Sequence, residues 1–407
     1  MPSTTLPSDS NTNVLSSHDA DRPATDRSPN DATASPGDSA QTQPQRVLDT
    51  TAKKPVVLVT GAAGLIGSKI VQRLTPDHTV VGLDLKPPES SHMDVHWYEL
   101  DLTEQDSVDS VMARIRDEHG DSIASVIHLA AYYDFSGAPS SLYHDLTVDG
   151  TRRMLRALQA FRVDQFIFSS TLLVQRSSEE GHPVTAFSPT EAEWDYPKSK
   201  LAAEAVIKEE RHKIPTLILR IAGVYDDLGH SPPITQQIKR IHEKELESYF
   251  FPGDKTHGQS FIHLDDLTEC LRAAVDRRAE LPPREILVIG EEDVMSYEEL
   301  QDSIGELIHG KQWPTIRIPK VMAKAGAWTK EKLASGDDDA PFIRPWMIDL
   351  ADQNYPVDLR RASDQLRWYP RHTLRSTLPV MIEHLRRNPK QWYETNHLPV
   401  PQELRHE

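Results

Sequence analysis

Cysteine is almost absent from this sequence, because Cys270 is the only one in 407 residues. A single thiol excludes a disulfide framework and a zinc site built from cysteines. The sequence also has no run of about 18 apolar residues, so we expect no membrane-spanning helix. Its first residues lack the apolar stretch or twin arginines of an export signal, and we therefore expect a cytoplasmic protein.

Positive charge is scarce as well, with 45 Lys and Arg against 62 Asp and Glu and a net charge of −17. Binding to nucleic acid needs a basic face toward the phosphates, so no nucleic-acid partner is predicted. No set of His, Asp and Glu has the spacing of metal ligands, so no metal is predicted. At about 100–200 residues per domain, the length suggests two or three domains.

Aromatic residues are missing from the first 52 residues, which carry seven Asp against three Arg. A segment rich in Ser, Thr, Asp and Pro cannot bury enough apolar surface to offset the entropy lost on ordering. Residues 1–52 are therefore predicted to form a disordered leader. Whether it is an interaction arm or only a solvated extension stays open.

From Pro55 onward, short apolar segments alternate with helical patterns. Val56–Val59 is β-branched and apolar, which is typical of a strand buried on both faces. Further strands are predicted at 79–85, 96–100, 125–130, 165–169 and 216–221, and helices at 68–74, 107–116, 142–161 and 196–212. This alternation predicts an α/β fold with a doubly wound parallel sheet, the Rossmann arrangement.

After about residue 225 the alternation weakens and Pro-rich loops separate the elements. We expect a Rossmann domain over 53–225 and a smaller, mixed α/β substrate-binding lobe over 226–407. Residues from about 258 to 290 are expected to return to the Rossmann domain. Helices are predicted at 234–245, 264–277, 296–308 and 377–387, and a strand at 285–289.

A glycine-rich turn, Thr60–Gly67, follows the first strand and opens a helix. In such a turn one glycine allows the tight bend, one lets the backbone approach a pyrophosphate and one allows close packing of helix on strand. The helix N-terminus offers free N–H groups to the phosphates. The spacing is GxxGxxG rather than GxGxxG, but the strand before and the helix after it indicate a dinucleotide site. The predicted cofactor contacts are Gly61, Gly64, Leu65, Ile66 and Gly67.

Asp84 ends the second strand, 17 residues after Gly67. A carboxylate there accepts hydrogen bonds from the adenosine ribose and repels a 2′-phosphate, which favours NAD over NADP. Lys86 lies close enough to weaken that preference. Asp101 and Leu102 end the third strand and are candidates to flank the adenine, although Asp101 is equally suited to cap the next helix.

Tyr196 and Lys200 lie four residues apart and therefore share a helix face. An ammonium near a phenol stabilises the phenolate and lowers a pKa that is about 10 in water. Such a tyrosine exchanges a proton with a substrate hydroxyl while a hydride moves to or from a nicotinamide. The pair is a candidate catalytic site.

With these motifs in order, the sequence resembles the extended short-chain dehydrogenases/reductases, in particular the NAD-dependent epimerase/dehydratase family. The resemblance extends from Val56 to about Pro370. Beyond the glycine turn, Asp84 and the Tyr196/Lys200 pair, its motifs are Asp101-Leu102, His128–Ala131, Phe166–Thr171, Phe261–Asp266 and Asp358 through Trp368-Tyr369-Pro370.

The resemblance implies specific roles. Thr171 would hydrogen-bond the reacting oxygen, with Ser170 as the neighbouring alternative. Tyr196 would be the acid/base, and Lys200 would bind the nicotinamide ribose and lower the pKa of the tyrosine. The family also implies a homodimer formed through the helices at 142–161 and 196–212. Further implied cofactor contacts are the backbone of Leu129, Ala130 and Ala131, together with Ile221.

Departures from the family pattern concern the substrate. Leu172-Leu173 stands where sugar dehydratases have an Asp-Glu pair, which argues against elimination of water. Gly223 and Gln259 replace an Asn and an Arg that hold a substrate diphosphate in nucleotide-sugar epimerases. A missing Arg removes a strong phosphate contact, for which Arg344 or Lys239 would have to compensate. Tentative substrate residues are Tyr132, Asp134 and Gln259.

Three functions follow as alternatives. The first is a nucleotide-sugar epimerase that oxidises a hydroxyl with NAD and reduces the ketone again on the other face. The second is a simple dehydrogenase or reductase of a non-nucleotide alcohol or carbonyl, favoured by the missing diphosphate contacts and by apolar residues around 327–328 and 341–352. The third is a non-catalytic NAD-binding sensor, against which Thr171, Tyr196 and Lys200 argue.

Overall fold

The computed structural model describes residues 53–88, 94–134, 137–333 and 343–405. The predicted leader, 1–52, lies outside these residues, as do residues 341–342 of the apolar region. No helix in the described part is long and apolar enough to cross a membrane.

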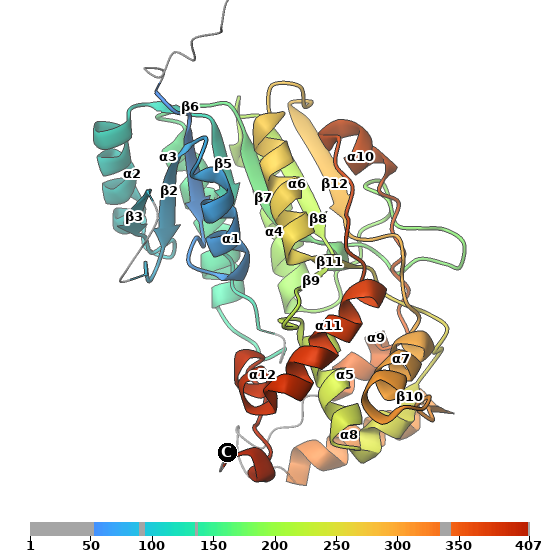
Figure 1. Cartoon of the computed structure of the whole chain (residues 1–407). Helices are drawn as coiled ribbons and strands as arrows, with labels where there is room; N and C mark the ends of the chain where they lie inside the picture. The colour runs from blue at the N-terminus through green and yellow to red at the C-terminus, as the bar shows by residue number, and fades with distance from the viewer. Residues whose placement is uncertain (1–52, 89–93, 135–136, 334–342, 406–407) are drawn as a thin grey trace, which may run out of the picture. The chain divides into compact units, whose positions relative to one another are not determined.

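A parallel sheet of seven strands forms the centre of the larger lobe (Figure 1). Its order is β12-β8-β7-β5-β1-β2-β3, so the direction of winding reverses beside β1. This is the point at which open α/β sheets bind ligands. The predicted doubly wound fold is confirmed. The strands are β1 Val56–Thr60, β2 Thr79–Asp84, β3 Val95–Glu99, β5 Ser125–His128, β7 Phe166–Thr171, β8 Thr216–Ile221 and β12 Arg284–Ile289.

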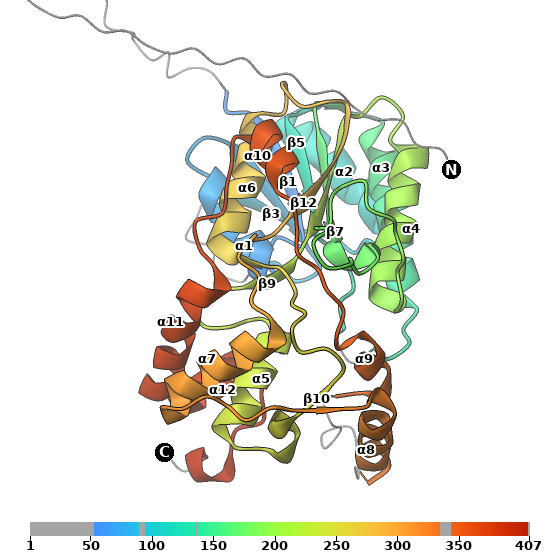
Figure 2. The same ribbon diagram turned by 90° about the vertical axis from the view of Figure 1, so that its right-hand side faces the viewer.

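Helices cover both faces of this sheet because its central strands are apolar on both sides (Figure 2). Val56 and Leu58 of β1 pack toward one group of helices, and Val57 and Val59 toward the other. The first group is α2 Gln105–His119, α3 Asp149–Leu158 and α4 Asp195–Glu210. The second is α1 Leu65–Leu74, α6 Leu264–Asp276 and α10 Arg360–Leu366. The single thiol, Cys270, is fully buried in this second core.

The predicted helix at 142–161 differs in detail. Its first part is a π-helix, η1 Tyr143–Val148, which is followed by α3. Hydrophobic periodicity cannot separate a turn of π-helix from α-helix over six residues. The position of Thr147 is fixed at this point, because its hydroxyl accepts a hydrogen bond from the Tyr132 N–H at 3.0 Å.

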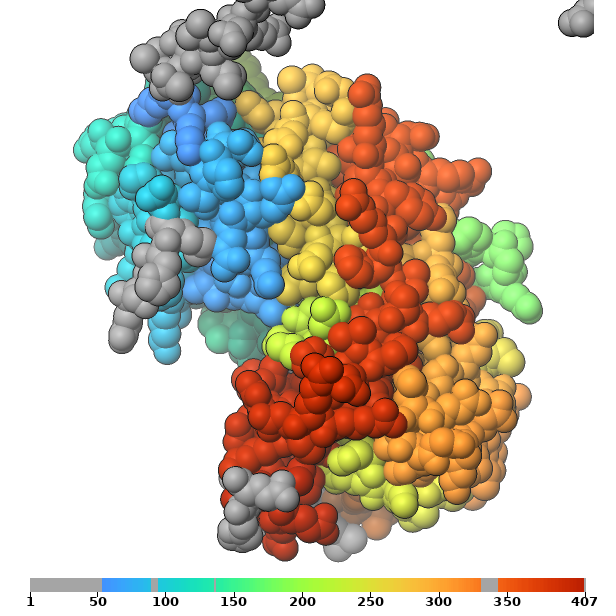
Figure 3. All heavy atoms as spheres, viewed as in Figure 1, coloured from blue at the N-terminus to red at the C-terminus, as the bar shows by residue number. Residues whose placement is uncertain are grey.

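The smaller lobe lies beyond the carboxyl ends of the strands (Figure 2). A separate apolar core joins α5, α7, α11 and α12, in which α11 packs on α7 and α12 packs on α11 (Figure 3). The helices are α5 Pro232–His242, α7 Tyr297–His309, α8 Lys320–Leu333, α9 Pro345–Leu350, α11 Leu374–Arg387 and α12 Pro389–Thr395. The short strand pairs are β4 Ser122–Ile123 with β6 Arg162–Val163, β9 Gly223–Tyr225 with β11 Phe261–His263, and β10 Phe250–Pro252 with β13 Ile316–Ile318. The 3₁₀ turns are η2 Leu172–Val174, η3 Leu246–Tyr249 and η5 Gln402–Leu404.

Glu291 ties the two lobes together just after β12. Its carboxylate accepts hydrogen bonds from the Tyr225 hydroxyl at 3.0 Å and from the Leu374 N–H at 3.0 and 3.1 Å. Tyr225 ends β9 and Leu374 begins α11. The side chain is only 1% exposed, and this burial raises the pKa of Glu291 to about 7, although both donors oppose the shift.

This carboxyl should make the stability of the protein depend on pH. Between pH 4.5 and about 7 the folded protein keeps a proton that the unfolded chain has released, so stability falls as pH rises through this window. The loss amounts to about 3 kcal/mol. We expect Glu291→Gln, which stays neutral, to remove this part of the dependence and to be more stable than the natural protein above pH 7.

Urea unfolding at several pH values measures the effect. Glu292→Gln is the matched control, because Glu292 is the exposed neighbouring carboxylate. If the curves for Glu291→Gln and the natural protein ran parallel from pH 5 to pH 8, the charge of Glu291 would not be linked to folding.

Candidate active site

The glycine turn is shaped by close backbone contacts that leave no room for a side chain at Gly61 or Gly67. Gly61 has φ +68°, a conformation that favours glycine. A Cβ at Gly67 would lie 2.1 Å from the Gly61 carbonyl oxygen, so α1 can pack on the turn only with glycine at this position. All five predicted turn residues, Gly61, Gly64, Leu65, Ile66 and Gly67, line one large cavity. This cradle fits the pyrophosphate of a dinucleotide.

The residues predicted for the adenosine half lie outside that cavity. The Asp84 carboxylate accepts hydrogen bonds from the Ala63 N–H at 3.0 Å and the Lys86 N–H at 3.2 Å, which places it at the edge of the turn. Asp101 accepts from both the N–H and the hydroxyl of Thr103, at 2.8 and 2.6 Å, the local capping arrangement. Leu102 is buried in the core, and its carbonyl oxygen accepts a hydrogen bond from the Arg153 guanidinium at 3.1 Å.

Tyr196, Lys200 and Thr171 come together at the carboxyl end of β7, as their predicted roles require. Tyr196 and Lys200 lie on the first turns of α4, and Thr171 is the last residue of β7. Thr171 is hydrogen-bonded to the Tyr196 phenol. The Lys200 ammonium donates to the Ser169 carbonyl oxygen at 2.7 Å and lies 5.9 Å from the centroid of the tyrosine ring. All three residues line the same cavity as the glycine turn.

The electrostatics differ from the sequence expectation in one respect. Burial raises the pKa of Tyr196 to about 12, and the hydrogen bond from Thr171 only partly offsets this. Burial also lowers the pKa of Lys200 to about 7, against the attraction of Glu204. The Lys200 ammonium is held by the Ser169 carbonyl oxygen rather than by the phenol, so burial dominates the pKa of Tyr196. That Lys200 lowers this pKa when NAD is bound stays a prediction.

Ser170, the neighbouring alternative to Thr171, is committed elsewhere. Its hydroxyl donates to the Glu204 carboxylate at 2.5 Å. Glu204 is also paired with Arg220 at 2.8 Å, and both side chains of that ion pair are buried. Breaking such a pair leaves an uncompensated buried charge. This support behind the site carried no sequence signal beyond the spacing of Lys200 and Glu204.

Of the implied cofactor contacts, Leu129, Ala131 and Ile221 line the cavity. Ala130 instead donates its N–H to the Thr60 hydroxyl at 3.2 Å. The adjacent His128 is fully buried and bonded to two threonine hydroxyls at 2.9 and 3.1 Å. Burial lowers its pKa to about 3, so it is a neutral core histidine.

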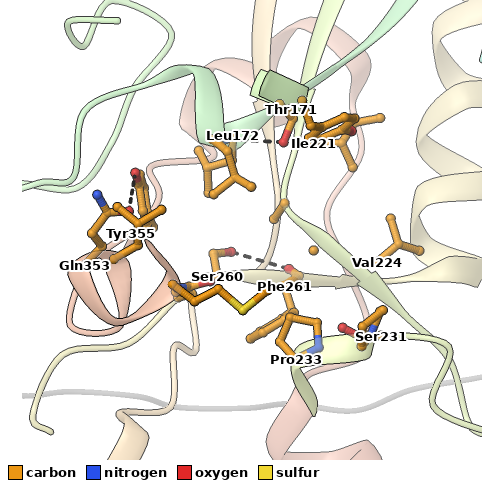
Figure 4. Close-up of a pocket in the computed structure, with 18 of the residues that line it drawn as sticks. Thr171, Leu172, Ile221, Val224, Ser231, Pro233, Ser260, Phe261, Gln353 and Tyr355 are labelled. Atoms are coloured by element: carbon orange, nitrogen blue, oxygen red, sulfur yellow. Dashed lines mark hydrogen bonds between the residues drawn. The ribbon is translucent and has the colours of Figure 1, made fainter. Parts of the chain in front are cut away.

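Aromatic rings surround the tyrosine on the substrate side. The rings of Tyr133 and Trp194 lie 4.9 and 5.5 Å from that of Tyr196, and Trp346 of α9 lies 5.0 Å from Trp194. The cavity encloses about 690 Å³. Thr171, Leu172 and Ile221 lie at one end of the view in Figure 4, and Ser231, Pro233 and Phe261 lie at the other. The cavity therefore runs from the sheet into the smaller lobe.

The tentative substrate residues separate into two groups. Gln259 lines the cavity, but Tyr132 and Asp134 do not. The ring of Tyr132 packs edge-on against Tyr143 at 4.8 Å, and the Asp134 carbonyl accepts the Tyr143 hydroxyl at 3.0 Å. Tyr133, the residue between them, is the one that reaches the cavity.

The packing of neighbouring side chains explains one departure from the family pattern, Gly223 in place of an Asn. A Cβ at Gly223 would lie 2.7 Å from the Phe261 ring, so the phenylalanine occupies the space that an Asn at 223 would need. Leu172 and Leu173 both line the cavity. Arg344 and Lys239, the two residues suggested to compensate for the missing Arg, do not line the cavity. Lys239 is instead paired with Glu243 and Glu245.

Within the described residues, one group of three potential metal ligands occurs, formed by His144, Asp145 and Asp149 on the surface. His144 Nδ1 lies 3.2 Å from the Asp149 carboxylate, which is an ordinary surface ion pair when the histidine is protonated.

The switch point of the sheet, the glycine cradle and the tyrosine and lysine that line the same cavity together define an α/β oxidoreductase fold that binds a dinucleotide. Residues 57–290 match the NAD dependent epimerase/dehydratase family. The chain therefore belongs to this family of NAD-dependent enzymes, and its cofactor is NAD.

Individual relatives are between about a quarter and 30% identical over the aligned residues. UDP-glucose 4-epimerase of Streptomyces lividans is 27% identical over 305 residues, which cover 68% of this chain and 89% of that protein. N-acetyl-alpha-D-glucosaminyl-diphospho-ditrans,octacis-undecaprenol 4-epimerase of Escherichia coli O157:H7 is 30% identical over 165 residues, 39% of this chain and 45% of that relative. This second match thus spans less than half the length of the E. coli protein.

Solved structures show the same fold. UDP-glucuronic acid 4-epimerase from Bacillus cereus, in complex with UDP-glucuronic acid and NAD, superposes with a TM-score of 0.60 at 22% identity. The match covers 82% of this chain and 99% of that one. MoeE5 in complex with UDP-glucose and NAD gives a TM-score of 0.61 at 23% identity and covers 81% and 98%.

Proposed function

We propose that this protein is a nucleotide-sugar epimerase that inverts a secondary hydroxyl of a sugar through a transient ketone. The observation that carries the proposal is the contact of Thr171 and Tyr196 in the cavity that also contains the glycine cradle. NAD supplies a site that takes up a hydride and later returns it. Because the hydride returns, the reaction needs no net oxidant.

The chain's own residues have separate tasks in this proposal. Tyr196 removes the proton of the substrate hydroxyl as that carbon is oxidised and returns it as the ketone is reduced. Thr171 holds the reacting oxygen against the phenol. Lys200 holds the nicotinamide ribose, with its ammonium fixed by the Ser169 carbonyl. Leu172 and Leu173 offer no carboxylate for eliminating water, which supports epimerisation rather than dehydration.

The test begins with the purified chain and no added cofactor. After acid release, bound nucleotide is identified as NAD or NADP by chromatography. The chain is then incubated with UDP-glucose, UDP-N-acetylglucosamine and UDP-glucuronic acid. We expect retained NAD and conversion of at least one sugar to its 4-epimer without stoichiometric NADH. Failure of all three to be converted or to raise the melting temperature would contradict the proposal.

A second candidate, a reductase of an apolar carbonyl, is favoured by the aromatic surroundings of Tyr196. Leu172, Leu173 and Met347 add an apolar wall to the same cavity. Stoichiometric consumption of NADH with a panel of ketones, together with no reaction of the UDP sugars, would establish this alternative.

We further propose that the protein is cytoplasmic and forms a homodimer through the helices of residues 143–158 and 195–210. The family resemblance supports this arrangement, and Ala202 and Ala205 present an exposed apolar strip on α4. Sedimentation equilibrium would measure the mass, and a monomer at micromolar concentration would contradict the dimer.

A further inference from the structure

Arg240, in the third turn of α5, reaches the part of the cavity that lies in the smaller lobe. Its side chain is half-buried, and the Nη1 atom is buried without any hydrogen-bond partner among the described residues. Buried guanidinium nitrogens normally have partners, since the desolvation of an unpaired charge is costly. Arg240 therefore lines the cavity with one guanidinium nitrogen, Nη1, whose hydrogen bonding is unsatisfied.

The neighbours of Arg240 do not supply the missing partner. The Tyr297 hydroxyl lies close enough to the guanidinium to interact with it, but it does not provide a hydrogen bond to Nη1. Glu247 is the nearby acid, but its carboxylate forms an ion pair with Lys330. Burial works to raise the pKa of Glu247, while Lys330 and, less strongly, Arg240 hold it below its ordinary value. The carboxylate is thus ionised and already engaged.

The cavity also lacks the groups that the family uses for a diphosphate. Gln259 lines it where an Arg is usual, and Phe261 fills the space beside Gly223 where an Asn is usual. Lys239, the neighbour of Arg240, is paired with two glutamates and does not line the cavity. Arg240 is the cation of this helix that remains available to a ligand.

We propose that Arg240 binds the anionic oxygens of the substrate diphosphate, in place of the arginine that Gln259 replaces. This inference rests on the proposed nucleotide-sugar substrate. A planar guanidinium donates two parallel N–H groups to a phosphate, and in a partly desolvated cavity this is a strong, charge-assisted contact. The phosphate would then complete the hydrogen bonding of Nη1.

The experiment compares binding of UDP and uridine by calorimetry to the NAD-loaded protein. We expect Arg240→Gln to weaken the binding of UDP by about 10- to 100-fold, the loss typical of a hydrogen bond between charged groups. The affinity for uridine should stay almost unchanged. Lys239→Gln is the matched control and should bind UDP as the natural protein does. In Arg240→Gln, adding Gln259→Arg should restore much of the UDP affinity.

Equal UDP affinity in Arg240→Gln and the natural protein would overturn the role of Arg240 and leave the epimerase proposal intact. Equal weakening of UDP and uridine would also overturn it, because the residue would then shape the lobe rather than bind the phosphates. A natural protein that binds neither UDP nor pyrophosphate would overturn both proposals. Melting temperatures of all variants establish that each is folded.

Discussion

Tyr196→Phe is expected to lower kcat by about 10²- to 10⁴-fold, the usual contribution of a positioned acid/base. The substitution removes only the hydroxyl that Thr171 contacts and keeps the ring among Tyr133 and Trp194. Retained NAD and the melting temperature should therefore stay close to those of the natural protein. Turnover of the best UDP sugar, with KM measured separately, is the readout.

Tyr132→Phe is the matched control for this experiment. It removes a hydroxyl from the same region, but the ring of Tyr132 packs on Tyr143 and does not line the cavity. We expect its kcat to change by less than about threefold, in line with a substitution away from the reacting atoms. If Tyr196→Phe turned over as fast as Tyr132→Phe, another group would have to move the proton.

Gly67→Ala is expected to destabilise the protein and to abolish retention of NAD. The new methyl group would lie 2.1 Å from the Gly61 carbonyl oxygen and 2.7 Å from the Ala62 Cα, so backbone has to move. Forced overpacking of this kind costs about 3 kcal/mol. Urea unfolding and the amount of NAD in the purified protein measure the two effects.

Gly64→Ala separates packing from cofactor binding. Gly64 has φ −72°, which alanine adopts freely, and its Cβ would meet only the Gly61 oxygen at 3.4 Å. We expect Gly64→Ala to have normal stability but to bind NAD more weakly, because this glycine lets the backbone approach the pyrophosphate. A Gly67→Ala protein as stable as Gly64→Ala would show that α1 does not pack on the turn as described.

The sequence identified the parts of the site that depend on local pattern. The glycine turn could be predicted because only glycine satisfies the positive φ of Gly61 and the close contact at Gly67. Tyr196 and Lys200 could be paired because four residues bring side chains to one helix face. Thr171 followed from the family pattern alone, since it lies on a different element from the tyrosine.

Contacts between distant segments escaped prediction. The ion pair of Glu204 with Arg220 joins α4 to β8, and no pattern in either segment predicts that the two side chains meet. The position of Arg240 could not be predicted, because the sequence does not show which of the two adjacent cations, Lys239 and Arg240, faces a cavity. The ring of Phe261 beside Gly223 could not be foreseen either, since it depends on the pairing of β9 with β11.

The sequence by itself excluded a disulfide framework and a membrane span through its scarcity of cysteine and of long apolar runs. The alternation of strands and helices and the order of the motifs determined the doubly wound fold, the family and the NAD cradle. Those properties arise from residues near one another in the chain, where steric and periodic rules act directly. Only the tertiary structure decided which charges remain available to a substrate. Burial, ion pairing and the closure of the smaller lobe over the sheet are long-range effects, and they leave Arg240 as the cation of α5 that faces the cavity.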